Sequence, residues 1–126
     1  MESTEPAGSV AIGDVNRDGK PLAMGDTLAN TIVSREIGAQ HLAVNYTRYE
    51  PGAEFPQHIH EDSEDVLFVV SGSGWLKDGE RMTPIAAGDV IFVRPGEAHG
   101  AVAGPSGMVI LGCQAPPDPK RERSIT

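Results

Sequence analysis

Two histidines separated by a single residue, His58 and His60, are the side chains whose type and spacing most directly suggest chemistry in this sequence. In an extended strand the side chains alternate between two faces, so histidines at i and i+2 point to the same side. Imidazole nitrogens bind first-row divalent metals, and nearby carboxylates suit the same ions. The carboxylates that crowd this stretch are Glu54, Glu61, Asp62, Glu64 and Asp65. Because an isolated H-x-H pair also occurs among surface and core histidines, the pair by itself suggests a metal site without establishing one.

A second block further along the chain, from Gly88 to His99, strengthens this interpretation. Together the two blocks resemble the two motifs of the cupin superfamily. The first motif of that family is a glycine, five residues, H-x-H, three or four residues, a glutamate, six residues and a glycine. The second is a glycine, five residues, P-x-G, two residues, a histidine, three residues and an asparagine. The resemblance covers residues 52 to 99 and implies an all-β fold, the cupin-type double-stranded β-helix or jelly-roll barrel.

The resemblance also implies a metal centre with three histidine ligands, His58, His60 and His99. Its cofactor would be one divalent transition metal ion, namely Fe, Mn, Ni or Zn. The family's glutamate ligand, counted back from Gly72, falls on Asp65. The implied ligand set is therefore three imidazoles and one carboxylate.

The fourth ligand is the point at which the sequence departs from the family. Asp65 is one methylene shorter than glutamate, so it reaches the metal after a small backbone shift, binds through water, or leaves the site to the histidines. Glu64 satisfies the shorter spacing from His60. If the strand keeps a period of two with Leu67 inside, Asp65 points inward and Glu64 outward. We therefore expect Asp65 to complete the site.

The second motif departs from the family at two positions that are not ligands. Arg94 replaces the first proline, and Ala103 replaces the terminal asparagine. Arg94 would bind a carboxylate substrate if it faced the pocket, but an arginine at a strand end is more often solvated or faces another subunit. We leave Arg94 out of the predicted site.

The residues around these motifs predict many short strands joined by tight turns. The chain is 39% hydrophobic, and its 15 glycines and 10 prolines suit turns better than long helices. Apolar residues alternate or form short runs bounded by turn residues, and Asp78-Gly79 is a hairpin signal. We predict strands at 31–36, 41–49, 55–60, 65–71, 73–77, 80–86, 90–94, 98–103 and 107–113. Strands of this number and length close best as a barrel or jelly roll.

The length of 126 residues fits a single domain. Residues 1–10 are small and polar without a period, and residues 114–126 combine prolines with charge. We therefore predict an N-terminal arm at 1–19, the cupin barrel domain at 20–113 and a C-terminal tail at 114–126.

Charge and composition exclude several partners and locations. The net charge of −8 argues against binding to nucleic acid, and no apolar run in the sequence approaches the roughly 18 residues of a membrane-spanning helix. Cys113 is the single cysteine, which rules out an intramolecular disulfide, and the N-terminus lacks the pattern of a secretory signal. We therefore expect a cytoplasmic protein that binds neither nucleic acid nor membranes.

Several other residues receive plainer interpretations. The segment 14–19, DVNRDG, matches the first half of a calcium-loop pattern, but the twelfth position is Gly25 instead of glutamate, so we expect an Asx-type turn. His41 has no partner at metal-site spacing, and Cys113 is interpreted as a small buried hydrophobe. Side chains that fit the mouth of a barrel, although the core needs them first, are Tyr46, Arg48, Phe55, Gln57, Trp75 and Met82.

Three histidines and a carboxylate leave two or three positions of a metal ion open to substrate or dioxygen. We expect a metal-dependent small-molecule enzyme of the cupin type, and we favour an oxygenase, dioxygenase-like, acting on an oxygen-rich chelating substrate such as a hydroxy acid, a sugar acid or an enolised diketone. The alternatives are a metal-dependent isomerase or decarboxylase, and a non-catalytic metal- or small-molecule-binding cupin. A second carboxylate or Tyr46 is considered as a general base, and no catalytic residue is assigned. By analogy with small cupins we expect a homodimer.

Overall fold

The computed structural model describes residues 10–24 and 26–118, and in them the chain is built almost entirely from β-strands. The strands are β1 (Lys20–Met24), β2 (Thr27–Val33), β3 (Ala43–Tyr49), β4 (Glu54–His58), β5 (Glu64–Asp78), β6 (Arg81–Ala86), β7 (Val90–Val93) and β8 (His99–Ala115). A short 3₁₀ helix, η1 (Arg35–Ile37), follows β2. The all-β fold predicted from the sequence is confirmed. The ends of the predicted arm and tail, residues 1–9 and 119–126, lie outside the described residues.

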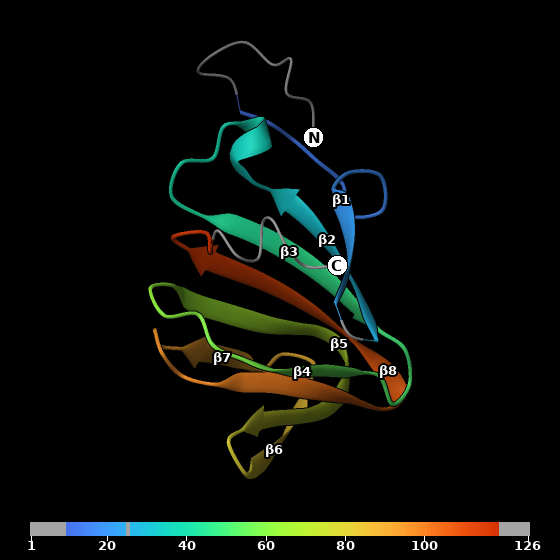
Figure 1. Ribbon diagram of the computed structural model, residues 1–126. Helices are drawn as coiled ribbons and strands as arrows, with labels where there is room; N and C mark the ends of the chain where they lie inside the picture. The colour runs from blue at the N-terminus through green and yellow to red at the C-terminus, as the bar shows by residue number, and fades with distance from the viewer. Residues whose placement is uncertain (1–9, 25, 119–126) are drawn as a thin grey trace.

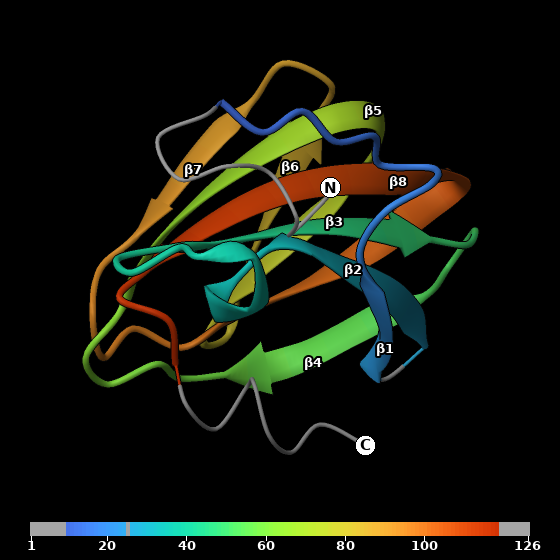
Figure 2. The same ribbon diagram turned by 90° about the horizontal axis from the view of Figure 1, so that it is seen from above.

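The two longest strands, β5 and β8, hold the barrel together. The strand order is β1-β2-β3-β8-β5-β6, with β4 paired to β8 and β7 paired to β5. β5 therefore pairs with β6, β7 and β8, while β8 pairs with β3, β4 and β5, always antiparallel. Figure 1 shows β1 and β2 at the end of the molecule opposite to β6, and Figure 2 shows β4 and β7 on opposite sides of β5, β8 and β3. This arrangement is the predicted jelly-roll barrel.

Glycines allow β5 and β8 to bend around the barrel without interrupting their pairing. The register between the two strands shifts at Gly72, which has a φ of 77°, and a Cβ atom there would collide with the carbonyl oxygen of Gly107. Only glycine accepts both this conformation and this close approach of two backbones. The sequence predicts two pieces for each long strand, at 65–71 and 73–77 for β5 and at 98–103 and 107–113 for β8. The structure joins each pair into one strand, because the glycines at the break absorb the bend.

The N-terminal strands differ most from the prediction. The sequence predicts a strand at 31–36, whereas β2 begins and ends earlier and η1 occupies the following turn. The side chain of Ser34 caps η1 by accepting a hydrogen bond from the backbone N–H of Glu36 at 3.2 Å. β1 was not predicted because Pro21 interrupts its apolar pattern, and proline is tolerated there because β1 is an edge strand. In the part of the chain that the structure describes, no helix has the length and hydropathy needed to span a bilayer.

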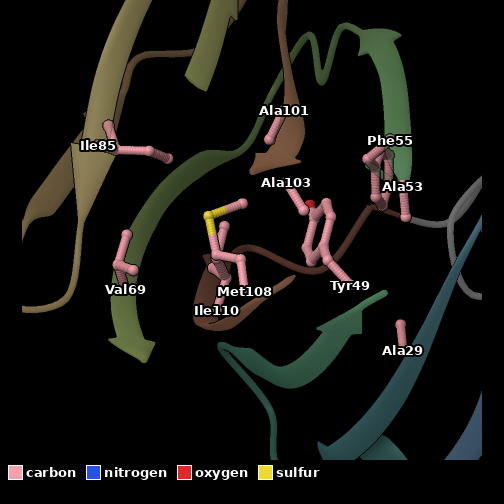
Figure 3. Packing of buried hydrophobic residues seen from close by; sticks show 10 residues of the cluster. All are labelled: Ala29, Tyr49, Ala53, Phe55, Val69, Ile85, Ala101, Ala103, Met108 and Ile110. Carbon is pink, nitrogen blue, oxygen red and sulfur yellow. The ribbon is translucent and has the colours of Figure 1, made fainter. Parts of the chain in front are cut away.

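The hydrophobic core lies inside the barrel and leaves space for a site. Its buried members are Ala29, Tyr49, Ala53, Phe55, Val69, Ile85, Ala101, Ala103, Met108 and Ile110. Figure 3 shows these side chains around a shared interior, with the Tyr49 ring next to Met108, its cross-strand partner. Burial of each large apolar side chain contributes about 1.5–3 kcal/mol to stability. The alanines in this set fill little volume, so the strands enclose room beside the core.

Candidate metal centre

Three histidines from two paired strands meet beside the core. His58 is the last residue of β4 and His99 the first of β8, and the Cα atoms of these two residues are direct partners across the strand pair. The ring centroids lie 4.2 Å apart for His58 and His99, 4.8 Å for His58 and His60, and 5.7 Å for His60 and His99. One nitrogen of each ring lies within 4.8 Å of the others. The structure therefore brings the three predicted histidines together, although 39 residues of sequence separate His60 from His99.

Asp65 faces the histidines and Glu64 does not. Asp65 is 4% exposed, while its neighbour Glu64 is exposed on the outer face of β5. The Oδ2 atom of Asp65 lies 3.6 Å from the Nε2 atom of His60 and 3.6 Å from the Nε2 atom of His99. These separations are too long for hydrogen bonds between the atoms, and they suit ligands around a shared ion. The inward orientation expected from the strand period is the one observed.

The Nδ1 atom of each histidine faces an oxygen atom outside the cluster. His58 Nδ1 lies 3.0 Å from the carbonyl oxygen of Pro56, and His99 Nδ1 lies 3.4 Å from that of Glu97. His60 Nδ1 lies 2.6 Å from a carboxylate oxygen of Asp118. Carbonyl and carboxylate oxygens only accept hydrogen bonds, so the proton at each contact belongs to Nδ1. In the neutral ring this leaves Nε2 unprotonated, which is the form that binds a metal.

The chemistry and spacing of this donor set fit a divalent metal ion. Metal–imidazole bonds are about 2.0–2.1 Å long, so two nitrogens on one ion lie at most about 4.2 Å apart. The observed spread of ring nitrogens, within 4.8 Å, is close to this limit. The Nε2 atom of His60 is buried and has no hydrogen-bond partner among the described residues. A buried imidazole nitrogen in this state is costly unless something binds it, and a metal ion would satisfy it.

A cavity opens beside the cluster and would admit a small molecule. Its volume is about 50 Å³, counted as the space open to the centre of a water-sized sphere, so it suits a compact molecule. His58, His99 and Asp65 form part of its wall, so an ion held by these side chains would be reached through the cavity. The rest of the wall consists of neutral residues: Asn45, Thr47, Tyr49, Phe55, Leu67, Leu76, Ile91, Gly100, Ala101, Ile110 and Gly112. Among the described residues, this wall contains no lysine or arginine.

The polar side of the cavity comes from β3, and it differs from the side chains considered in the sequence. Asn45 and Thr47 point inward and are buried, and the hydroxyl group of Thr31 donates a 2.8 Å hydrogen bond to the amide oxygen of Asn45. Tyr46 and Arg48 occupy the alternate positions and point outward, with the Arg48 guanidinium 5.1 Å from the centroid of the Tyr46 ring. Tyr46 is therefore not placed to act as a general base in this cavity, because its strand position directs it to the opposite face.

Of the other side chains considered for the barrel mouth, only Phe55 lines the cavity in the described part of the chain. Gln57 instead binds the turn between β5 and β6. Its side-chain amide donates a 2.8 Å hydrogen bond to the carbonyl oxygen of Gly79 and accepts a 3.0 Å hydrogen bond from the N–H of Gly79. Trp75 and Met82 are exposed to solvent. The strand carrying His58 is thus tied to a neighbouring hairpin by a residue on its opposite face.

Arg94 and Cys113 take no part in the histidine cluster. The Arg94 side chain is 70% exposed and lies over the ring of Phe92, 5.5 Å from its centroid. Burial, and to a smaller degree the nearby Asp65 carboxylate, raises the pKa of the Cys113 thiol, so this cysteine is not activated as a nucleophile. His41 is exposed and lies outside the group of histidines that approach one another.

The acidic segment 14–19 forms the turn expected from its sequence. Asp14 Oδ1 accepts a hydrogen bond from the N–H of Asn16 at 2.7 Å, and Asp18 Oδ2 accepts one from the N–H of Asp14 at 2.9 Å. The Arg17 guanidinium lies 2.6 Å from Asp18 Oδ2. These carboxylates are engaged by backbone N–H groups and a cation, as in an Asx-type turn.

Asp118 contacts the site and was missed by the sequence analysis. β8 continues to Ala115, and the chain then returns to place the Asp118 carboxylate against His60. These residues belong to the segment 114–126, where prolines and charge suggested a tail. No spacing rule connects an aspartate with a histidine 58 positions earlier, so only the tertiary structure reveals the contact.

Fold and site together define a small all-β barrel with a cluster of three histidines inside it. A family model described as "Cupin domain" matches residues 45–111, and the chain belongs to this family. The resemblance recognised in the sequence is thereby confirmed.

Two curated relatives carry names that bear on function. An oxalate-binding protein of Thermotoga maritima is 37% identical over 49 residues, which is 39% of this chain and 40% of that protein. An (R)-mandelonitrile lyase of Granulicella tundricola is 37% identical over 59 residues, which is 46% of this chain and 44% of that protein. The chain therefore matches less than half the length of either relative.

Solved structures of similar shape come from several cupin-like proteins. A predicted oxalate decarboxylase from Thermotoga maritima has a TM-score of 0.74 at 20% identity and covers 85% of this chain and 100% of that one. An RmlC-like cupin from Shewanella frigidimarina has a TM-score of 0.74 at 22% identity, with coverage of 90% and 96%. The polyketide cyclase RemF from Streptomyces resistomycificus has a TM-score of 0.70 at 27% identity, with coverage of 84% and 80%. The first two similarities establish the fold alone.

Proposed function

We propose that this protein is a metal-dependent enzyme of small-molecule metabolism, with the ion held by His58, His60, His99 and Asp65. The observation that carries the proposal is the buried cluster of converging donor atoms beside an open cavity. Structural metal sites are closed by protein ligands, whereas catalytic sites keep positions open toward a cavity. Here the cavity reaches two of the three histidines and the carboxylate.

A divalent Fe, Mn, Ni or Zn ion in this position would supply Lewis-acid chemistry, or dioxygen chemistry in the case of iron, to an oxygenated substrate. The protein's own residues would position that substrate. Asn45, fixed by Thr31, and the Thr47 hydroxyl offer neutral hydrogen-bonding groups from β3, while Phe55 and Leu67 exclude water. These four side chains would therefore orient a substrate without adding a charge to that of Asp65.

The residues of the cavity wall favour some of the substrate classes expected from the sequence over others. A sugar acid presents many hydroxyl groups that need partners, and burying them against an apolar wall is unfavourable. An enolised diketone or a small hydroxy acid presents a compact pair of oxygens to the metal and an apolar remainder to the wall. We therefore favour a substrate of this second kind.

The reaction type has two candidates. We favour an oxygenase because the four proposed ligands would leave two positions of a six-coordinate ion, one for an oxygen atom of the substrate and one for dioxygen. A metal-dependent lyase or decarboxylase is the second candidate, and it is favoured by the match to a protein named (R)-mandelonitrile lyase. The non-enzymatic alternative is a protein that binds a small molecule without converting it, and the match to a protein named oxalate-binding protein supports it.

Elemental analysis of the purified protein, followed by activity measurements on metal-loaded and chelator-treated samples, tests the proposal. We expect about one transition metal ion per chain and an increased melting temperature when metal is present, because an ion that binds only the folded state stabilises it. Oxygen uptake with enolised diketones would identify an oxygenase, while product formation without uptake would identify a lyase. The proposed site would be overturned if the purified protein contained no metal and its melting temperature stayed the same when metal or chelator was added.

The predicted homodimer, the cytoplasmic location and the absence of nucleic-acid and membrane partners remain predictions from the sequence. Size-exclusion chromatography with light scattering measures the first of these directly. A monomer at micromolar concentration would contradict it.

A further inference from the structure

The segment that follows β8 packs back onto the loop between β4 and β5. Gln114, which is 2% exposed, is the cross-strand partner of Asp65, so this end of β8 lies next to the proposed ligands. The amide oxygen of Gln114 accepts a hydrogen bond from the backbone N–H of Asp118 at 2.7 Å. Two residues before Asp118, the carbonyl oxygen of Pro116 accepts a 2.6 Å hydrogen bond from the hydroxyl group of Ser63. The segment is therefore held at two points independent of His60.

These two attachments bring the Asp118 carboxylate to His60. Its Oδ2 atom lies 2.6 Å from His60 Nδ1, and the two side chains are 13% and 8% exposed. A contact this short between largely buried groups is a strong, charge-assisted hydrogen bond. His60 Nε2, on the other side of the ring, faces Asp65 and the histidine cluster.

We propose that Asp118 is a positioning residue of the metal centre. Its carboxylate keeps the His60 proton on Nδ1 and fixes the plane of the ring, so that the Nε2 lone pair is aimed at the ion. This proposal rests on the proposed function, because it assigns His60 as a ligand. A carboxylate behind a metal-binding imidazole also makes that imidazole a stronger ligand.

The other two histidines provide an internal comparison. His58 and His99 have backbone carbonyl oxygens opposite Nδ1, at 3.0 Å and 3.4 Å. These carbonyls are neutral and belong to the same stretch of chain as the histidine they contact. His60 differs because its Nδ1 contact is shorter, involves a charged group and comes from a residue 58 positions later in the sequence. Loss of Asp118 should therefore affect one ligand selectively.

Metal affinity in the full-length protein tests this role, measured by competition with a chromophoric chelator using Mn²⁺ and Zn²⁺. We expect Asp118→Ala to weaken metal binding about 10–100-fold, the usual effect of losing such a partner, and Asp118→Asn to weaken it less. The matched control is Ser63→Ala, which releases the same segment at Pro116 but keeps the carboxylate. We expect Ser63→Ala to bind metal nearly as well as the wild-type protein.

The tautomer of His60 gives a second readout that needs no metal. In ¹⁵N NMR spectra of the metal-free protein, recorded at alkaline pH where imidazoles are neutral, we expect Nδ1 of His60 to carry the proton in the wild type. In Asp118→Asn, whose side chain has nearly the same shape, we expect a mixture of tautomers or a shift of the proton to Nε2. The signals of His58 and His99 should stay unchanged.

Two results would overturn the proposal. One is an unchanged His60 tautomer together with wild-type metal affinity in both Asp118 variants. The other is a loss of affinity in Ser63→Ala as large as in Asp118→Ala, which would mean that tethering of the segment matters and the carboxylate does not. If the wild-type protein bound no metal, the proposed function would fail, and the NMR comparison would still decide whether Asp118 sets the tautomer of His60.

Discussion

The segment from His58 to Asp65 and the turn at 14–19 both match cation-binding patterns in the sequence, yet their polar atoms are arranged in opposite ways. In the turn, carboxylate oxygens accept hydrogen bonds from backbone N–H groups, and Arg17 pairs with Asp18. In the first segment, Nδ1 of each histidine faces an oxygen outside the cluster, and the opposite ring edges converge in the interior. The carboxylates of the turn bond to the backbone of the turn itself, whereas the histidine nitrogens of the other segment converge on a common point.

The placement of donor atoms, more than their number, therefore defines a metal site. In the turn, Asp14 is exposed, so water also solvates its carboxylate, and the half-buried Asp18 has the Arg17 guanidinium as its partner. The histidine cluster is mostly buried, and His60 Nε2 finds no hydrogen bond in the described part of the chain. A buried polar atom without a partner is unfavourable, so the cluster gains more from an ion than the turn does.

The largest expected effect is the loss of a histidine ligand. We predict that His60→Ala lowers metal affinity by at least about 100-fold, more than the loss of an outer partner does. The matched control is His41→Ala, since His41 is exposed and lies apart from the cluster. Isothermal titration with Mn²⁺ or Zn²⁺ measures both variants. Full metal occupancy in His60→Ala would show that the ligand assignment is wrong.

A smaller effect is expected for the carboxylate, which is the weakest member of the predicted ligand set. We predict that Asp65→Asn lowers metal affinity about 10-fold, because the charge is lost while the shape of the side chain is kept. Glu64→Gln, one residue earlier on the outer face, should leave affinity unchanged. If the two variants exchanged these outcomes in the same titration, Glu64 would be the ligand and β5 would have a different register in solution.

No effect of calcium is expected at the turn. Adding millimolar Ca²⁺ should leave the melting temperature of the wild-type protein unchanged, because the turn lacks the bidentate glutamate of a calcium loop and its carboxylates already have partners. Differential scanning fluorimetry measures this directly. A calcium-dependent rise that disappears in Asp14→Asn would contradict the interpretation of the segment as an Asx-type turn.

A further prediction for the turn concerns the titration of Asp18. The hydrogen bond from the Arg17 side chain is the main cause that lowers the pKa of this carboxyl group well below its ordinary value. A pKa lowered by folding means that the carboxylate stabilises the turn above the ordinary aspartate pKa, and that this contribution is lost as the pH falls toward the lowered value. NMR titration should show a low midpoint for Asp18, and Arg17→Ala should raise it. An ordinary midpoint in the wild-type protein would contradict the observed pairing.

Much of the fold and most of the candidate site could be predicted because they depend on local patterns. Strand alternation predicted that Asp65 points inward and Glu64 outward. The H-x-H spacing predicted that His58 and His60 lie on one side of a strand at 55–60, whereas β4 ends at His58 and His60 reaches the cluster from the loop that follows. The position of His99 came from its match to the second family motif. These features need only the period of a strand or a fixed spacing between residues.

The remainder depends on contacts between distant parts of the chain. The prediction divided β5 at Gly72 because a glycine normally interrupts a strand, but here it allows two backbones to pass closely. Asp118 followed two prolines in a charged stretch, which is typical of a tail. Its contact with His60 depends on Gln114 and Ser63, and no periodic pattern links these residues.

The position of β8 has a consequence for how the protein is made. His58, His60 and Asp65 leave the ribosome well before β8, the strand that pairs with β3, β4 and β5 and begins with His99. Pairings between strands so far apart in sequence form slowly, since long loops must close first. A growing chain therefore carries only part of the proposed ligand set until β8 has emerged. If the proposed site binds a metal, binding would then follow the synthesis of β8, and a chain truncated before β8 would lack His99.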